Sequence, residues 1–325
     1  MARAATRSGL TTRFPFFGEA GGYESFYVRA VDPARPRSVW LRHTVHQAPD
    51  EAPVGSLWLT VFDADRPEPL AYKESSDNPQ VDGWLRVGES SFGPDGVHGA
   101  AGPAKWDLTW SGAEPPLRHL PKSFMYSAPL PKTKLESPRP HVIVSGTVTV
   151  GGQVFELDGW PGMVGHNWGA QHAERWIWLH GVLFEDRPDD WLDIALGRIR
   201  VGRVLTPWVA NGVISLNGER VRIGGLGARM HANEGPSHLD LNLHGHDARL
   251  RLTVHSNRPQ TVVWRYADPD GGEHHVANCS IAELEAVVIP RDGMAVTLRT
   301  AYGGAYELGA REVPANLPVQ PFPDP

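Results

Sequence analysis

The sequence predicts an all-β protein, and three observations carry that prediction. Gly and Pro contribute 35 and 29 of the 325 residues, and both interrupt the interior of a helix. Short runs in which apolar and polar residues alternate, the period of a β-strand, recur along the chain. Helical periodicity is confined to residues 281–288, which fit a strand equally well. Roughly fifteen short strands suit two barrels or sandwiches of about eight strands each, because closure removes exposed strand edges.

The predicted strands are separated by recognisable turn residues. Gly151-Gly152 predicts a tight hairpin turn, and Asn217-Gly218 has the composition of a type I′ turn. Residues 115–140 are rich in Pro and are predicted to form an ordered loop across the surface or a barrel mouth. In chain order, the predicted strands are residues 38–46, 55–62, 84–87, 106–110, 141–150, 153–157, 174–184, 192–200, 209–216, 219–223, 238–243, 249–255, 261–266, 287–289, 295–299 and 305–309.

Composition and charge argue against several classes of function. The formal net charge is -6 and no basic run is present, so we expect no nucleic-acid partner. The single cysteine, Cys279, excludes an internal disulfide and a thiolate-rich metal site. No apolar stretch reaches the roughly 18 residues of a membrane span, and residues 1–17 lack the apolar region of a signal peptide. A cytoplasmic protein with at most peripheral membrane contact is therefore expected.

Neither a metal nor a cofactor is expected. The 15 histidines include two local clusters, His244-Gly245-His246 and His274-His275. The H-E-x-x-H pattern and a cysteine framework are both lacking, so we predict no bound metal. Phosphate-binding glycine motifs and the nucleophile elbow are lacking too, and the glycine-rich residues 223–227 precede no predicted helix. The sequence therefore predicts a protein that works without a cofactor.

One strand, residues 174–184, concentrates aromatic side chains. Its other face is largely aliphatic, and a strand that is apolar on both faces is expected to be buried on both. Alternation places four side chains together on one face: Glu174, Trp176, Trp178 and His180.

A polar pair precedes this strand. Gly165 and Gly169 flank His166 and Asn167, and glycine readily adopts positive φ. We therefore predict a sharp turn here, which presents the two polar side chains to one end of an apolar pocket.

These two motifs, Gly-His-Asn-Trp-Gly and the Trp-x-Trp strand, carry a resemblance to a known family. They are similar to tocopherol cyclase, to hydroxyneurosporene synthase (the carotenoid hydratase) and to related tandem lipocalin-like proteins. The similarity runs from about residue 129 to residue 181, with supporting matches at Pro131-Lys132-Thr133-Lys134 and Trp106-Asp107-Leu108.

The resemblance implies two lipocalin-like antiparallel β-barrels in tandem. We place the first barrel at residues 1–188, with both aromatic motifs inside it, and the second at residues 189–325. The resemblance also implies a pocket, in or between the barrels, that takes a long, apolar isoprenoid or polyene molecule.

Five polar residues are candidates for catalysis. His166 and Asn167 could donate hydrogen bonds to a substrate oxygen, or they could satisfy backbone groups at a turn. His180 could act as a general acid or base, or it could be a buried core histidine. Glu174 and Asp107 are candidate acids, because burial raises the pKa of a carboxyl group; a solvated strand end is the alternative.

Five aromatic residues are candidates for contact with an apolar substrate. The face of an indole ring attracts a developing carbocation by about 0.5–2 kcal/mol. Core packing accounts for any single tryptophan equally well. The five are Trp106, Tyr126, Trp168, Trp176 and Trp178.

The first functional hypothesis is a cofactor-independent enzyme that hydrates, cyclises or isomerises an apolar small molecule, as a hydratase or a cyclase does. An aromatic pocket that folds a flexible substrate and excludes water suits such chemistry. The alternatives are a non-catalytic carrier of a lipid or isoprenoid, and a structural protein whose barrels are filled by their own side chains.

Overall fold

Residues 12–324 are described by a computed structural model, and they form an almost entirely β structure. Two short 3-10 turns, Ser123–Tyr126 and Arg258–Gln260, are the only helical elements in this part of the chain. None of its helical turns is long or apolar enough to cross a bilayer. The prediction of an all-β fold is confirmed.

The first half of the chain forms an eleven-stranded antiparallel sheet, with the strand order β4-β3-β2-β1-β11-β10-β8-β7-β6-β5 and β9 paired to β10. Gly151 and Gly152, both at positive φ, join its two longest strands, as the sequence predicts. The strands are β1 (Gly22–Val31), β2 (Arg37–Gln47), β3 (Val54–Asp63), β4 (Leu70–Asp77), β5 (Leu85–Val87), β6 (Ser90–Phe92), β7 (Gly96–Ala101), β8 (Ala104–Ser111), β9 (Leu117–Arg118), β10 (Thr133–Val150) and β11 (Gln153–Gly169).

The second half forms a ten-stranded antiparallel sheet in the order β17-β16-β13-β12-β23-β22-β20-β19-β18, with β21 paired to β22. Residues 281–288 lie in strand β22 and form no helix. The strands are β12 (Arg175–Gly181), β13 (Trp191–Arg198), β16 (Val209–Leu216), β17 (Glu219–Gly224), β18 (Arg229–Gly235), β19 (His238–His244), β20 (Ala248–His255), β21 (Val262–Ala267), β22 (Glu273–Pro290) and β23 (Val296–Ala310), and a separate hairpin pairs β14 (Arg200–Val201) with β15 (Val204–Leu205).

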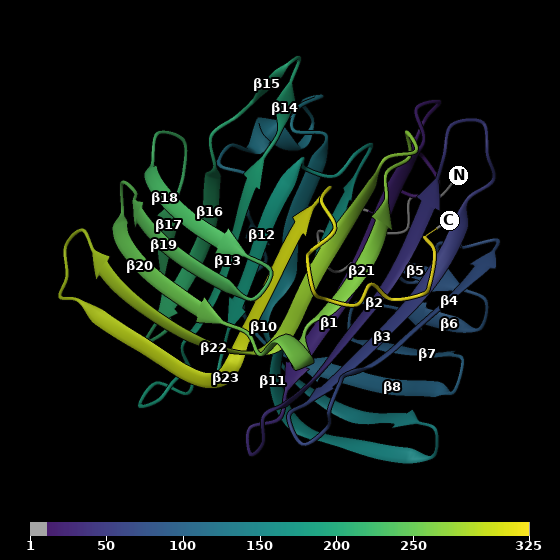
Figure 1. Cartoon of the computed structure of the whole chain (residues 1–325), viewed down its shortest axis with the longest axis horizontal. Helices are drawn as coiled ribbons and strands as arrows, with labels where there is room; N and C mark the ends of the chain where they lie inside the picture. Colours follow the sequence, from purple (N-terminus) through teal and green to yellow (C-terminus); the bar gives the residue numbers. More distant parts are fainter. Residues whose placement is uncertain (1–11, 325) are drawn as a thin grey trace.

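The two sheets curl over separate apolar cores and lie beside each other, with β1–β3 next to β21 and β22 (Figure 1). Every residue of β1 is buried, because one face of the strand covers the first core and the other meets the second sheet. Aromatic rings cross this junction, as where Trp58 of β3 meets the edge of Trp264 of β21 at 5.1 Å between ring centroids. Large aromatic surfaces buried in this way stabilise the junction of the two halves.

Strand β12, which contains Trp176 and Trp178, lies in the second sheet. It pairs with β13 on one side and with β23 on the other. The prediction that placed this strand in the first barrel therefore differs from the observed pairing, and the change of sheet falls between residues 169 and 175. Alternation within a strand defines its two faces but carries no information about its distant partners.

The prediction of a sharp turn at residues 165–169 is wrong, because these residues form the end of the β-strand β11. Gly165 and Gly169 allow the neighbouring strands to approach closely and do not form a turn. A Cβ atom at Gly165 would overlap the ring of Tyr27 on the neighbouring strand β1, and neither Gly165 nor Gly169 has positive φ. Consecutive strand residues point to opposite faces, so His166 and Asn167 cannot both face one pocket.

A buried histidine in β2 predicts that the fold is sensitive to acid. His43 lies between Phe92 and Trp106, and neither ring nitrogen has a hydrogen-bond partner among residues 12–324. Burial lowers the pKa of His43 to about 3, whereas in the unfolded chain it is about 6.5. The unfolded chain thus binds an extra proton between these values, and stability falls as the pH drops from about 6.5 towards 3.

We expect His43→Phe to remove this part of the acid sensitivity. Between pH 7 and pH 4.5, the free energy of unfolding of the wild type should fall by about 2 kcal/mol more than that of the variant. Urea unfolding at the two pH values measures both changes. Equal losses in the two proteins would show that His43 does not contribute.

Candidate functional site

A cavity of about 320 Å³ lies between the two sheets. One side is formed by the Pro-rich segment before β10, together with β10 and β11, and the other side by β12, β13 and β16. Its volume is at the lower end of the about 300–1,000 Å³ typical of small-molecule sites. Most of the wall is apolar, with contributions from Leu120, Met125, Leu135, Ile177, Leu196 and Val209.

A buried polar cluster lies at one part of the cavity wall. Asp193 of β13 is fully buried and accepts hydrogen bonds from the Ser137 hydroxyl at 2.5 Å and the Trp178 indole nitrogen at 3.1 Å. His119, which lines the cavity, places Nε2 3.2 Å from the Ser137 hydroxyl and 3.3 Å from Asp193 Oδ2. Its Nδ1 lies 3.4 Å from the carbonyl oxygen of Asn211.

Both ring nitrogens of His119 face hydrogen-bond acceptors, and Asp193 is ionised. Ser137 gives its only hydroxyl proton to Asp193, so its oxygen can only accept from His119. Asn211 offers a carbonyl oxygen, which is also an acceptor. Burial opposes ionisation of Asp193, but the neighbouring His119 outweighs it and lowers the pKa of Asp193 below its usual value. An imidazolium held in this way can donate a proton.

Asn167 and the two tryptophans of β12 connect this cavity to a smaller one. Both cavities are lined by Asn167, Trp176 and Trp178, and the smaller has a volume of about 50 Å³. The Oδ1 atom of Asn167 is buried and has no hydrogen-bond partner in the part of the chain that the structure describes. It is therefore open to a donor that the protein itself does not supply.

The smaller cavity is lined by charged and polar side chains as well as aromatic ones. Arg42 is buried there, donates to the Ser25 hydroxyl at 2.7 Å and stacks on the ring of Tyr266 at 3.9 Å. Glu307 accepts a hydrogen bond from the Trp176 indole at 2.8 Å. A polar space of this size can hold at least one water molecule.

The two predicted catalytic histidines, His166 and His180, lie outside both cavities. His166 is clamped between two carboxylates, with Nε2 2.7 Å from Glu24 and Nδ1 3.2 Å from Glu136. His180 is buried against Arg29, whose Nη1 lies 2.8 Å from His180 Nδ1. Burial, reinforced by Arg29, lowers the pKa of His180 to about 3. Neither side chain lines either of these two cavities.

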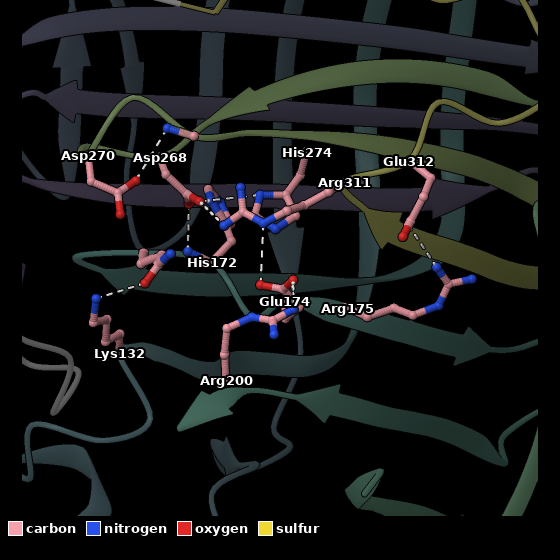
Figure 2. Close-up of polar contacts among 12 residues, drawn as sticks. Lys132, His172, Glu174, Arg175, Arg200, Asp268, Asp270, His274, Arg311 and Glu312 are labelled. Atoms are coloured by element: carbon pink, nitrogen blue, oxygen red, sulfur yellow. Dashed lines mark hydrogen bonds and ion pairs between the residues drawn. The ribbon is translucent and has the colours of Figure 1, made fainter. Parts of the chain in front are cut away.

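The two candidate acids differ from expectation as well. Glu174 forms ion pairs with Arg200 at 2.6 Å and Arg311 at 3.3 Å (Figure 2). The hydrogen bond from Arg200 lowers the pKa of Glu174 despite partial burial, the opposite of what a proton donor needs. Asp107 is exposed on β8.

Of the predicted aromatic residues, only Trp176 and Trp178 line the cavities. Trp106 packs in the first core, and Trp168 stacks on His166 at 4.5 Å between ring centroids. Tyr126 lies behind the wall, where its hydroxyl donates to the Leu135 carbonyl oxygen at 2.8 Å.

Sequence reasoning missed His119, Ser137 and Asp193. A signal for Asp193 was present, because strand Trp191–Arg198 is apolar on both sides of this single carboxylate. A lone acid in a strand buried on both faces must find a partner. No local pattern marks His119, which lies in the Pro-rich segment.

Another buried cluster adjoins the cavity wall and contains His172, Asp268 and His274 (Figure 2). His172 also lines the cavity, and its ring stacks on Tyr23 at 4.0 Å between centroids. The three residues come from the connection before β12, the turn after β21 and the start of β22. The sequence drew attention to His274 only through its neighbour His275.

Comparisons with known proteins agree with this fold. No family model matches the chain. The uncharacterized protein Rv0493c of Mycobacterium tuberculosis strain H37Rv is 25% identical over 293 residues, which cover 86% of this chain and 84% of that protein. The uncharacterized protein MT0513 of another strain of the same species matches equally.

Three solved structures share the arrangement of strands. Kievitone hydratase from Nectria haematococca superposes with a TM-score of 0.54 at 11% identity, over 89% of this chain and 88% of that one. CghA gives 0.60 at 9% identity, over 90% and 88%. A putative AttH from Nitrosomonas europaea gives 0.52 at 12% identity, over 94% and 100%. At these identities the likeness shows the fold, which is that of tandem lipocalin-like proteins.

Proposed function

We propose that this protein is an enzyme that acts without a cofactor on an apolar small molecule bound between its two sheets. The observation that carries this proposal is the apolar cavity with His119 in its wall, where His119 contacts the buried Ser137 and Asp193. An apolar pocket with a few convergent polar groups is the common form of a small-molecule site. Kievitone hydratase, which shares the fold, is by name a hydratase, which supports the same class of reaction.

The geometry assigns a role to each polar group. His119 donates a proton, and Asp193 holds the imidazolium in place and balances its charge. An imidazolium is too weak an acid to protonate an isolated double bond, so the proton goes to a hydroxyl or carbonyl oxygen of the substrate. Loss of a protonated hydroxyl as water begins in this way. Addition of water to a double bond conjugated with a carbonyl, and cyclisation next to a carbonyl, begin with the same proton or hydrogen bond on the carbonyl oxygen.

The tryptophans and the smaller cavity complete the proposed site. The indole rings of Trp176 and Trp178 stabilise positive charge that develops on the substrate. The polar cavity beside them can supply a water molecule for hydration. The resemblance of residues 129–181 to isoprenoid-converting proteins supports an isoprenoid- or polyene-like substrate, and the cavity volume limits its buried part to a compact molecule.

Filling the cavity tests whether it holds a ligand. Ala195 of β13 lines the cavity, and Ala195→Trp would place an indole ring inside it. The wild type, purified from its native source, is expected to retain an apolar small molecule in native mass spectrometry, and Ala195→Trp should retain at least tenfold less.

Val154→Trp is the matched control, because Val154 is exposed on β11 and lies outside the cavity. It should retain the ligand as the wild type does. A wild-type protein that carries no ligand and does not enhance the fluorescence of 1-anilinonaphthalene-8-sulfonate would contradict the proposal and favour filled barrels.

A further inference from the structure

Two buried histidines outside the proposed catalytic cluster lie against one buried carboxylate. Nδ1 of His172 lies 2.8 Å from Asp268 Oδ1, and Nδ1 of His274 lies 3.4 Å from Asp268 Oδ2. One nitrogen or oxygen atom from each residue lies within 4.8 Å of the other two. The side chains of Asp268 and His274 are fully buried, and that of His172 is nearly so.

The hydrogen-bonding capacity of this cluster is only partly used. His172 Nε2, Asp268 Oδ2 and both ring nitrogens of His274 are buried without a hydrogen-bond partner among the described residues. Native structures rarely leave several neighbouring polar atoms unsatisfied, and water or a bound ion commonly satisfies them. Most of these atoms carry a lone pair, so an ion bound among them would be a cation rather than an anion.

We propose that His172, Asp268 and His274 bind a Zn²⁺ ion. Two imidazoles and one carboxylate are a common set of three protein ligands for zinc, with a fourth position left to water. Ligands at the usual zinc distances in a tetrahedron are about 3.3 Å apart. His274 Nδ1 already lies 3.4 Å from Asp268 Oδ2, whereas His172 Nδ1 lies 2.8 Å from Asp268 Oδ1 and would move slightly away from it. Coordination through His172 Nδ1 replaces its hydrogen bond to Asp268, and the ring proton moves to Nε2, so the imidazole stays neutral.

The ion would connect parts of the chain that are far apart in sequence. His172 lies in the segment that leads from the first sheet into the second, whereas Asp268 and His274 flank the turn between β21 and β22. Three ligands on one ion would fix this segment and with it the part of the cavity wall that His172 forms. The proton transfer proposed for His119 does not use this ion, so the zinc site and the proposed catalysis can be tested independently.

Arg311 is the cation that the ion must compete with. Its Nη2 lies 3.5 Å from Asp268 Oδ2, while its Nε pairs with Glu174 at 3.3 Å (Figure 2). The side chain is 35% exposed, so it can turn away from Asp268 while it keeps Glu174 as a partner. Removal of the Arg311 charge is therefore expected to tighten zinc binding, because like charges close to a bound cation oppose it.

Zinc titration of the full-length protein tests the proposal. After treatment with EDTA and dialysis, isothermal titration calorimetry with Zn²⁺ should show one site per chain in the wild type. We expect His274→Ala to weaken this binding at least 30-fold and Arg311→Met to tighten it at least threefold. His275→Ala is the matched control, because His275 is the neighbouring residue but does not belong to the cluster, and its affinity should stay within twofold of the wild type.

A second variant distinguishes the loss of a zinc ligand from the loss of the folded structure. His172→Phe keeps an aromatic ring stacked on Tyr23 and removes the ligand nitrogen Nδ1, and it should also weaken binding at least 30-fold. The Co²⁺ form of the wild type should show the strong visible absorption of a tetrahedral site. Equal zinc affinities in the His274→Ala and His275→Ala proteins, or a wild type without a site tighter than millimolar, would refute the proposal.

Discussion

Replacement of His119 by Ala is expected to lower the turnover number for the ligand of the cavity by about 100- to 10,000-fold, the usual contribution of a positioned acid or base. The affinity for that ligand should change little, because the wall of the cavity is mostly apolar. The compound released from the wild type is the substrate or product to use, and its conversion is followed by liquid chromatography with mass spectrometry. A titration followed by native mass spectrometry gives the dissociation constant.

Asp193→Asn separates a chemical role of this pair from a merely structural one. The amide keeps the shape of the side chain but removes the charge that stabilises the imidazolium of His119. The pH above which activity declines should therefore shift to a lower value in this variant. His244→Ala, on an exposed position of β19, should match the wild type. Unchanged turnover in His119→Ala would exclude the proposed acid, and a wild type that binds its ligand without converting it would be a carrier.

The class of the fold could be predicted from the sequence because it rests on local patterns. Alternation and turn residues are local, so the hairpin at Gly151-Gly152 and the strands at residues 38–46 and 55–62 are confirmed. The partners of β12 are not local. Its residue Trp176 donates a hydrogen bond to Glu307, 131 residues away, and no window of sequence contains both.

Gly165 and Gly169 show a second reason why the sequence alone could not predict the structure. Glycine suits both a turn with positive φ and a close approach between strands, and the two alternatives predict opposite orientations for His166. The ring of Tyr27, which packs against Gly165 from β1, decides between them. That contact joins residues 138 positions apart in the chain (165 − 27), so the motif alone could not decide.

The candidate site was predictable only on its aromatic side. Trp176 and Trp178 alternate in one strand, and the structure places both at the cavities. The polar side is assembled from three separate segments, with Ser137 and Asp193 lying 56 residues apart. His119 comes from the Pro-rich loop, where the sequence shows neither strand alternation nor a motif. Chemistry that depends on such distant partners becomes visible only once the chain is folded.

His166 is the histidine of the Gly-His-Asn-Trp-Gly motif. We expect its replacement to affect the stability of the fold more than catalysis. Glu24 is fully buried and Glu136 nearly so, and the imidazolium of His166 lies between them. Burial alone would lower the pKa of His166, but the hydrogen bonds to Glu136 and Glu24 outweigh it and raise the pKa above its usual value. Removal of the cation leaves Glu24 only the backbone N–H groups of Arg13 and Phe14, and leaves Glu136 only Arg118 at 3.9 Å. Loss of the charge partner of a buried carboxylate costs about 3–5 kcal/mol.

His166→Phe isolates this charge, because a phenyl ring can keep the stacking on Phe26 and Trp168. We expect the free energy of unfolding of this variant, measured in urea at pH 6, to be about 3–5 kcal/mol lower than that of the wild type. The pKa of His166 is higher in the folded state than its unfolded value of about 6.5. The stabilisation by the His166 charge is therefore complete below about pH 6.5 and is lost as the pH rises through the folded-state pKa. The difference between the two proteins should therefore shrink in alkaline solution.

Two further variants decide whether the carboxylates cause the loss. Addition of Glu24→Gln to His166→Phe removes one unpaired charge and should recover part of the lost stability, whereas a defect of packing would stay or grow. His98→Phe replaces an exposed histidine of the same sheet and should change stability by less than about 0.5 kcal/mol. A His166→Phe protein as stable as the wild type at pH 6 would mean that His166 is not the cation that holds Glu24 and Glu136 together, and would reopen a catalytic role for it.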